Sequence, residues 1–357
     1  MRVAVDATPL VGPRTGVGRF VEALLPALGA LGNVDVEPYV LSRRATDLPP
    51  GTKRVIVPAA VALRSWGRRG PSLAPLFPRA EVIHGTNQIA PPTAHTVVTV
   101  HDCSFVTARE LCSPTVVSFG PVVRRIAASG GWIHTPSEHV AVQARALFET
   151  DRVVAVPHGP PPPPFAASTT VPRRRSVLAI GTLEPRKNFP RLVHAFKAVA
   201  AHDPDLTLTI AGADGPDSEH VRSAIASLDP KVRGQVRLTG WIDDNTRDAL
   251  LAEASVLAYP SLDEGFGLPM LEAWQRDLPV VAARAGALPE VAGDAALLVD
   301  PLDVDALAGA LQEALDDEAT RAVLVDHGRA RLATFSWEAA AEGIAAIYRR
   351  AMEDLPR

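Results

Sequence analysis

The chain has 357 residues, of which 47% are hydrophobic and 21% charged, and its formal net charge at pH 7 is −4. This composition excludes a disordered chain, and the length exceeds what one hydrophobic core usually serves, so we expect a globular protein of two domains. Cys103 and Cys112 are the only cysteines, which excludes a disulfide framework, and the absence of a signal peptide and of a bilayer-spanning apolar run favours the cytoplasm.

The first half of the chain alternates strand-like and helix-like segments, which is typical of an α/β domain. A strand is expected at Arg2–Asp6 and a helix from near Arg19. Gly16 and Gly18 then fall in the turn between them, where glycine lets the backbone approach a ligand closely, although an ordinary strand-to-helix turn explains them equally well. Further strands are expected at residues 33–41, 54–58 and 81–84.

A buried strand at Val97–Val100 ends in His101 and Asp102. In parallel sheets the carboxyl ends of the strands border the crevice where ligands bind, so both side chains are candidates for a site. The alternative is a structural histidine whose hydrogen bonds are satisfied within the fold. Ile133–Pro136 is the next strand, and Ser137 is placed to cap the helix after it.

Five consecutive prolines, Pro160–Pro164, follow His158 and Gly159. Such a run favours extended polyproline II and makes a semi-rigid spacer, so we place the domain boundary here. The expected domains are residues 1–160 and 161–335, followed by a final helical segment at 336–357.

Charge differs between the two halves. Residues 1–165 contain 16 Lys and Arg against 11 Asp and Glu, net +5, whereas the remainder contains 20 against 29, net −9. A solvated surface explains the basic half, and peripheral attachment to an anionic membrane is the functional alternative, at about 1 kcal/mol per basic residue. Nucleic acid is disfavoured because no recognition motif accompanies the charges. The basic residues gather around Trp66: Arg43, Arg44, Lys53, Arg54, Arg64, Arg68 and Arg69.

The second half repeats the strand and helix alternation. Ser176–Ile180 is a strand, and Gly181 opens the loop GTLEPRKN before an amphipathic helix. Arg186 and Lys187 lie just before this helix, where cations and free N–H groups together suit a diphosphate. Later strands are expected at 206–210, 235–239, 279–282 and 296–299, and helices at about 303–333 and 336–352.

The segment AYPSLDEGFGLPMLEA, residues 258–273, is the most informative part of the chain. The strand Val256–Tyr259 stops at Pro260 and leads into a glycine-punctuated loop, and Pro269 marks the first turn of a helix. Glu264 lies at the mouth of the loop, and Glu272 is expected near the first turn of the helix. Two carboxylates on different elements at a strand end suit the hydroxyl groups of a nucleotide sugar.

The pair Glu264 and Glu272, with seven residues between them in EGFGLPMLEA, resembles the paired-glutamate motif of retaining glycosyltransferases with the GT-B fold, in particular glycosyltransferase family four, also called group 1. That fold has two Rossmann-like domains, with the acceptor bound by the first and the nucleotide sugar by the second. The resemblance spans nearly the whole chain. It implies that the last helix packs on the first domain.

Site residues follow from this resemblance. GTLEPRKN resembles the segment that binds the leaving diphosphate through Arg186 and Lys187, and VVTVHDCSF resembles the segment whose histidine, here His101, contacts the donor sugar. Glu264 is expected on the sugar and Glu272 on the ribose. The remaining donor contacts are expected from Gly16, Gly18, Gly181, Trp241, Ile242, Gly265, Phe266, Gly267 and Leu268, with Trp241 and Ile242 near the nucleobase.

The function implied is transfer of a hexose from a nucleotide diphosphate sugar to a hydroxyl of a glycan, lipid-linked or small-molecule acceptor, with retention of configuration. No metal or other cofactor is expected, because no D-x-D motif occurs in a suitable loop. Mannose from GDP-mannose is favoured, since similar RKN and TGVGRF loops occur in mannosyltransferases. Two alternatives stay open: a nucleotide-sugar epimerase of the same fold and a non-catalytic nucleotide-sugar binding protein.

Overall fold

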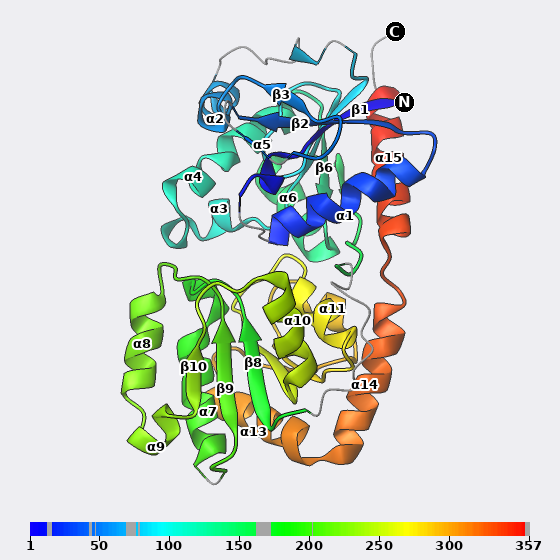
Figure 1. The fold of residues 1–357 in the computed structure, drawn as a ribbon. Coiled ribbons are helices and arrows are strands. Elements are labelled where there is room, and N and C mark those ends of the chain that lie inside the picture. Colours follow the sequence, from blue (N-terminus) through cyan, green and yellow to red (C-terminus); the bar gives the residue numbers. More distant parts are fainter. Residues whose placement is uncertain are drawn as a thin grey trace. The chain divides into compact units, whose positions relative to one another are not determined.

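The computed structural model describes residues 1–12, 16–42, 45–46, 48–68, 76–77, 79–161, 173–201 and 203–353. They form two compact units, each of which is described by itself (Figure 1). Unit 1 combines Met1–Pro161 with Phe335–Arg357, and unit 2 is Pro162–Thr334. The predicted linker prolines 162–164, and Arg43, Arg44 and Arg69 of the basic cluster, lie outside the described residues.

Unit 1 is built on a seven-stranded sheet with the order β3-β2-β1-β4-β5-β6-β7, in which all neighbours are parallel. Within it, β1 pairs Val3 with Val36 of β2 on one side and with Val82 of β4 on the other. The strands are β1 Arg2–Asp6, β2 Asp35–Leu41, β3 Lys53–Val55, β4 Val82–Gly85, β5 Thr96–Thr99, β6 Trp132–Thr135 and β7 Val153–Ala155.

Helices cover both faces of this sheet. Alternation along β1 sends Val3 and Val5 into a cluster with α1 and α15, and Ala4 into a second cluster with α2, α5 and α6. The apolar runs of the strands therefore reflect burial on two sides. The helices are α1 Gly16–Ala30, α2 Ala59–Gly67, α3 Ser104–Thr107, α4 Pro114–Val117, α5 Phe119–Ala128, α6 Glu138–Phe148 and α15 Trp337–Glu353, with 3-10 turns at Thr8–Leu10 and Arg109–Leu111.

The final helix α15 belongs to the core of unit 1. Ile344 and Tyr348 are fully buried on its inner face, and Trp337 at its start donates a 2.6 Å hydrogen bond from Nε1 to the carbonyl of Pro160. A Cβ atom at Gly343 would lie 2.7 Å from a methyl of Val156, so glycine permits the close approach of helix and chain. Residues more than 150 positions apart thus complete one hydrophobic core.

A line of buried polar groups crosses unit 1 beneath its helices. Tyr348 Oη is 2.7 Å from His84 Nδ1, His84 Nε2 is 2.8 Å from Thr99 Oγ1, and Thr99 Oγ1 is 2.9 Å from His134 Nδ1. His134 Nε2 lies 3.0 Å from the carbonyl of Val156, which can only accept. His134 therefore donates from Nε2 and, as a neutral imidazole, accepts at Nδ1 from the Thr99 hydroxyl. The Thr99 oxygen then accepts from His84 Nε2, and His84 Nδ1 accepts from the Tyr348 hydroxyl.

Unit 2 is built on a six-stranded parallel sheet with the order β10-β9-β8-β11-β12-β13. The inner residues of β8 pack with α7, α8 and α13 on one face. On α11, Trp274 is buried and closely approaches Gly328 of α14. The strands are β8 Ser176–Ile180, β9 Thr207–Ala211, β10 Val236–Leu238, β11 Val256–Tyr259, β12 Val280–Ala283 and β13 Leu297–Val299. The helices are α7 Phe189–Ala200, α8 Ser218–Ala226, α9 Pro230–Arg233, α10 Asp244–Glu253, α11 Leu268–Trp274, α12 Leu288–Ala292, α13 Val304–Asp316 and α14 Glu318–Leu332, with a 3-10 turn, η4, at Pro185–Lys187.

The α/β class with two Rossmann-like domains is confirmed, and several local predictions are corrected. The first helix begins at Gly16 rather than near Arg19; Gly18 packs in the core, and the N–H groups of a first helical turn have no intrahelical acceptors to satisfy. The segment 303–333 contains two helices, since Asp317 interrupts it and caps α14 by accepting from the backbone N–H of Ala319 at 2.8 Å.

Two predictions about surface residues also need correction. Residues 56–58 do not continue the strand predicted at 54–58 but lead into α2, which the sequence pattern did not predict. Trp66 on α2 is fully buried, so it belongs to the core and not to the basic surface.

No helix within the described ranges is both long and apolar enough for a membrane span. Both cysteines are free.

Candidate active site

Glu264 is the centre of an ion-pair cluster in unit 2. It follows β11, and its carboxylate accepts from Arg186 Nη1 at 2.9 Å through Oε2 and from Lys187 Nζ through Oε1. Arg186 also binds Glu184 at 3.0 Å. The carboxylate and the Lys187 side chain are both about nine-tenths buried. The two basic residues and the first glutamate of the predicted motif therefore meet at one point.

Three loops are tied together around this cluster. The backbone N–H of Leu262 donates to the carbonyl of Arg186 at 2.7 Å, and Asn188 Nδ2 donates to the carbonyls of Pro260 and Pro301 at 3.0 and 2.8 Å. Gly286, at φ +56°, lies against the backbone of Glu264, where a Cβ would approach the nitrogen to 2.5 Å. The loops hold the cluster rigidly, and glycine is required at position 286.

Opposing effects set the charge of this cluster. Burial by itself raises the pKa of the Glu264 carboxyl, but the positive charges of Arg186 and Lys187 outweigh it and hold the pKa at about 2. Burial lowers the pKa of Lys187, and the Glu264 carboxylate opposes this change. Lys187 also lies 5.1 Å from the ring centre of Tyr259. Glu264 is thus an ionised, charge-compensated carboxylate in a largely dry site.

Glu272 has a partner that the sequence did not reveal. It is the fifth residue of α11, directly after the first turn and thus near the predicted position, and its carboxylate accepts from Arg247 Nε at 3.0 and 2.9 Å and from Arg247 Nη2. Both side chains are largely buried, at 6% and 17% exposure. Arg247 comes from α10, whose weak amphipathic pattern gave no signal for a buried charge. The second glutamate is therefore held in a fixed orientation.

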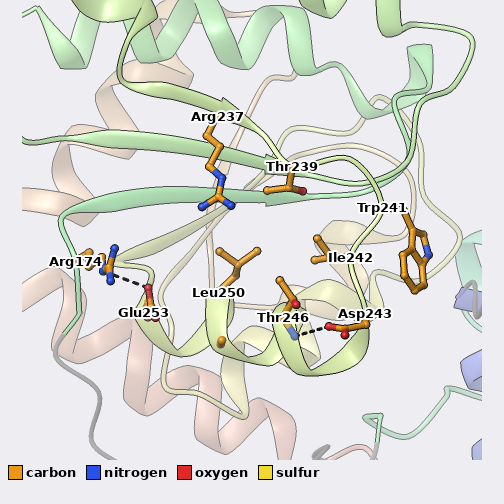
Figure 2. A pocket seen from close by; sticks show the side chains of 10 residues that line it. Arg174, Arg237, Thr239, Trp241, Ile242, Asp243, Thr246, Leu250 and Glu253 are labelled. Atoms are coloured by element: carbon orange, nitrogen blue, oxygen red, sulfur yellow. Dashed lines mark hydrogen bonds and ion pairs between the residues drawn. The ribbon is translucent and has the colours of Figure 1, made fainter.

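A cavity of about 570 Å³ lies beside α10 in unit 2. Thr246, Leu250 and Glu253 line it from the helix, and Trp241 and Ile242 line it from the loop after β10 (Figure 2). Trp241, 60% exposed, stands at one end, and the ion pair of Arg174 and Glu253, 3.2 Å long, at the other. The predicted nucleobase residues thus border a cavity of ligand size.

The glycine-punctuated loop takes the expected place between β11 and α11. Phe266 is buried, Gly265 precedes it, and Gly267 occupies the N-cap position of α11, with Leu268 as the first helical residue. Gly181, which follows β8, lies against the Lys187 side chain, where a Cβ would approach Cε to 3.1 Å. Gly181 therefore makes room for Lys187.

In unit 1, His101 follows β5 and its Nε2 lies 2.8 Å from the carbonyl of Thr86. A carbonyl only accepts, so Nε2 carries the hydrogen and Nδ1 is left as an acceptor. Burial lowers the pKa of His101, which makes it neutral at pH 7. Asp102 accepts instead from Ser104, from N at 2.9 Å and from Oγ at 2.5 Å, so Thr86 and not Asp102 orients His101.

The neighbours of His101 are aromatic. Phe20 meets it edge-on with ring centres 5.1 Å apart, and Phe20 also packs on His158 at 4.4 Å. His158 stacks on Trp337, and Gly159 allows the close approach of that tryptophan. Through its contacts with Phe20 and Trp337, His158 packs in the core of unit 1. Gly16 and Gly18 belong to the first turn of α1, and Phe20 follows as its fifth residue.

No group of three or more His, Cys, Asp or Glu side chains suited to a metal ion occurs in the described part of the chain. The roles given to the site residues, and the absence of a metal, stay predictions.

Comparisons with known proteins agree with this architecture. Residues 165–331 match the family model of glycosyl transferases group 1. The chain is 28% identical over 370 residues to an O-antigen chain mannosyltransferase B of Escherichia coli, covering 95% of this chain and 97% of that one. It is 38% identical over 186 residues to an MMP alpha-(1->4)-mannosyltransferase of Mycolicibacterium hassiacum, covering 50% and 44%.

Solved structures support the fold. A sucrose-phosphate synthase from Thermosynechococcus elongatus superposes with a TM-score of 0.75 at 22% identity, covering 98% of both chains. WaaG, a glycosyltransferase involved in lipopolysaccharide biosynthesis, gives a TM-score of 0.72 at 17% identity, covering 97% and 99%. At these identities the likeness is one of fold.

Proposed function

We propose that this group 1 glycosyltransferase with the GT-B fold transfers a hexose from a nucleotide diphosphate sugar to an acceptor hydroxyl with retention of configuration. Mannose is favoured as the sugar and GDP as the carrier, because two relatives are named mannosyltransferases. The observation that carries the proposal is the cluster of Glu264, Arg186 and Lys187 at the ends of β8 and β11.

The two cations of this cluster, Arg186 and Lys187, can bind a diphosphate in place of the Glu264 carboxylate. Arg186 and Lys187 neutralise Glu264 in the free protein. A bound diphosphate would take over part of this positive charge, and the oxygens of Glu264 would then accept hydroxyl hydrogens of the sugar. Glu272, oriented by Arg247, would accept from the ribose hydroxyls, and the cavity at Trp241 and Ile242 would receive the base.

The transfer step needs no protein nucleophile. The bond between the anomeric carbon and the diphosphate oxygen breaks, and the acceptor oxygen bonds to the same face of that carbon. The acceptor proton passes to the departing diphosphate, whose charge is stabilised by Arg186 and Lys187. His101, neutral and with Nδ1 as an acceptor, is assigned to the donor sugar. No metal is invoked, so turnover should survive excess EDTA.

Two measurements test the proposal. Thermal shift against GDP, UDP, ADP and dTDP identifies the carrier, since a ligand at a hundred times its dissociation constant stabilises by about 2.7 kcal/mol. The matching nucleotide sugar is then incubated with the protein without an acceptor. Slow release of free sugar supports a transferase, a C2-epimerised donor indicates an epimerase, and binding without turnover indicates a binding protein. An α-linked product from an α-linked donor establishes retention.

A lipid-linked acceptor and peripheral attachment to an anionic membrane are further parts of the proposal. The support is a surface of unit 1 that combines basic residues with exposed apolar ones, Ile56 at 70% and Val61 at 55% exposure. Lys53 and Arg54 lie on β3, and Arg64 on α2. Co-sedimentation with anionic but not with neutral vesicles is expected, and equal binding to both would contradict the electrostatic part.

A further inference from the structure

Arg237 faces the cavity of unit 2 that borders Trp241 and Ile242. It is the middle residue of β10, the edge strand of the six-stranded sheet, and it lines the cavity together with Thr239 (Figure 2). Leu250 lines the same cavity from α10. A side chain from the sheet and an apolar side chain from the helix thus border one space of about 570 Å³.

Four charged residues line this cavity, and three of them have partners. Arg174 pairs with Glu253 at 3.2 Å, and Asp243 caps α10 by accepting from the backbone N–H of Thr246 at 2.8 Å. The guanidinium of Arg237 is exposed and has neither a hydrogen bond nor an ion pair among the described residues. A guanidinium carries five N–H donors in a fixed planar fork. The cavity therefore offers a ligand one cation whose donors the described part of the chain does not use.

The remaining walls suit a planar ring. Ile242 and Leu250 are half-buried apolar side chains, and the indole of Trp241 is 60% exposed at one end of the cavity. Apolar and aromatic side chains hold the faces of a base, and a few polar groups then recognise its edge. Arg237 is placed to supply such a group.

The edges of the bases differ in what they offer a guanidinium. Guanine has two adjacent acceptors, O6 and N7, which match two N–H groups of an arginine fork. Adenine has an N6 amino donor beside N7, so one N–H group would face another donor. Uracil and thymine have the O4 acceptor but no N7, which leaves half of the fork unpaired. Guanine is the base that satisfies both N–H groups.

We propose that Arg237 selects the donor nucleotide by donating two hydrogen bonds to O6 and N7 of guanine. The inference rests on the proposed transfer and deepens it, because it names the residue that distinguishes GDP from ADP, UDP and dTDP. Every residue that it uses belongs to unit 2. Since the Arg237 side chain is exposed, its substitution removes ligand contacts without leaving a buried partner unsatisfied.

Calorimetry with matched nucleotides tests which edge of the base is recognised. The probes are GDP, 7-deaza-GDP, in which a C–H group replaces N7, IDP, which keeps O6 and N7 but lacks the 2-amino group, ADP and UDP. IDP should bind within about threefold of GDP, whereas 7-deaza-GDP, ADP and UDP should bind about fivefold or more weakly than GDP. If 7-deaza-GDP bound as tightly as GDP, or IDP as weakly as ADP, the proposal would be overturned.

The variant Arg237→Gln tests whether this residue makes the contact. It should bind GDP about tenfold more weakly than the wild type does, and it should bind GDP and 7-deaza-GDP equally, because no guanidinium remains to use N7. ADP should lose little affinity, since glutamine can pair with N6 and N7 of adenine. A variant that still preferred GDP over 7-deaza-GDP as strongly as the wild type would overturn the assignment.

Arg233→Gln is the matched control. It makes the same change of charge at the last residue of α9, outside the cavity lining, and should keep the wild-type preference for GDP over 7-deaza-GDP. An equal loss of this preference in both variants would reduce the effect to general charge and overturn the role of Arg237.

Failure of this inference is separable from failure of the proposed function. Preferred binding of UDP or ADP, with turnover of the matching nucleotide sugar, would refute the selection of guanine and leave the glycosyl transfer standing. The expected order of affinities without turnover of any GDP-sugar would support the selection of guanine and refute the transfer. Absence of binding by all five nucleotides would refute both.

Discussion

Tyr348 donates a hydrogen bond to His84 across 264 positions of sequence, at 2.7 Å and in a fully buried setting. The direction is fixed at the far end of the line, where the Val156 carbonyl requires His134 to donate from Nε2. Burial lowers the pKa of both imidazoles in the line, in His134 to about 4, so each is neutral at pH 7 and has one defined tautomer. The final helix is thus fixed to the sheet by a specific polar contact in addition to its apolar face.

Tyr348→Phe should destabilise unit 1 by about 1 to 3 kcal/mol, because it leaves His84 Nδ1 buried without a donor. Tyr39→Phe is the matched control: the Tyr39 hydroxyl is buried in the same unit, with no hydrogen-bond partner among the described residues. Its removal should change stability by less than about 0.5 kcal/mol or increase it. Denaturant unfolding of both variants measures the difference, and equal losses would mean that the hydroxyls matter only through packing.

Stability should fall as the pH is lowered from 7 towards 4. Burial lowers the pKa of His84, His101, His134 and His158 from the ordinary 6.5, in His134 to about 4. The unfolded chain then binds more protons than the folded one between these values, so acid favours unfolding. Asp6 opposes this as a single group, because burial raises its pKa to about 6. Melting temperatures between pH 4 and 8 that stay flat or rise on acidification would contradict the prediction.

Glu264→Gln should destabilise unit 2 by about 3 kcal/mol, since Lys187 and Arg186 lose their buried counter-charge. A bound nucleoside diphosphate should reduce the difference in stability between the variant and the wild type, because its phosphates supply the missing negative charge. Glu184→Gln, which removes a partly exposed partner of Arg186, should cost little with or without nucleotide. The test is to measure the melting temperatures of the wild type, Glu264→Gln and Glu184→Gln with and without the nucleotide that binds. If nucleotide left the difference between Glu264→Gln and the wild type unchanged, the diphosphate would bind elsewhere.

Arg247→Leu should raise the donor KM about tenfold with a smaller effect on kcat, because Glu272 loses the partner that orients it for the ribose. Arg247→Lys should restore part of the affinity. Arg276→Leu breaks a comparable ion pair to α10, with Asp248 at 2.7 Å, and should affect stability without raising KM. If Arg276→Leu raised KM as much as Arg247→Leu, the effect would be one of helix packing.

His101→Ala should retain nucleotide affinity within twofold and lose about a hundredfold or more in transfer rate. The side chains assigned to the base, the ribose and the diphosphate belong to unit 2, whereas His101 and the donor glycines Gly16 and Gly18 belong to unit 1. Calorimetry with the nucleoside diphosphate gives the affinity, and Lys187→Ala serves as the variant expected to lose it. A comparable loss of affinity in both variants would refute this division of roles.

The sequence was sufficient for the strands and for the first contacts of the site. Ser176–Ile180 and Val256–Tyr259 have the predicted limits, because strands buried on both faces read as uninterrupted apolar runs. Arg186 and Lys187 adjoin Glu264 because both segments end neighbouring strands of one sheet. Their roles in binding and catalysis are predictions that contacts alone do not test.

Other features depend on tertiary contacts that leave no local pattern. Arg247 looks like an ordinary surface residue of a polar helix, and its pairing with Glu272 exists only once α10 lies against α11. Asn188 reads as a turn residue, yet its amide joins two further loops. Trp66, placed among basic residues in the sequence, is turned inward because α2 packs its apolar face on the sheet.

The interrupted course of unit 1 sets an order of events during synthesis. Its sheet is complete by Ala155, but the helix that covers one face begins at Trp337. At ordinary translation rates of about 5 to 20 residues per second, the intervening chain takes on the order of 10 to 35 s to emerge. Throughout that time Val3, Val5 and Phe20 lack part of their cover, and His84 has not met Tyr348. The nascent first half is therefore a natural client for chaperones, while unit 2, made without interruption, can fold ahead of it.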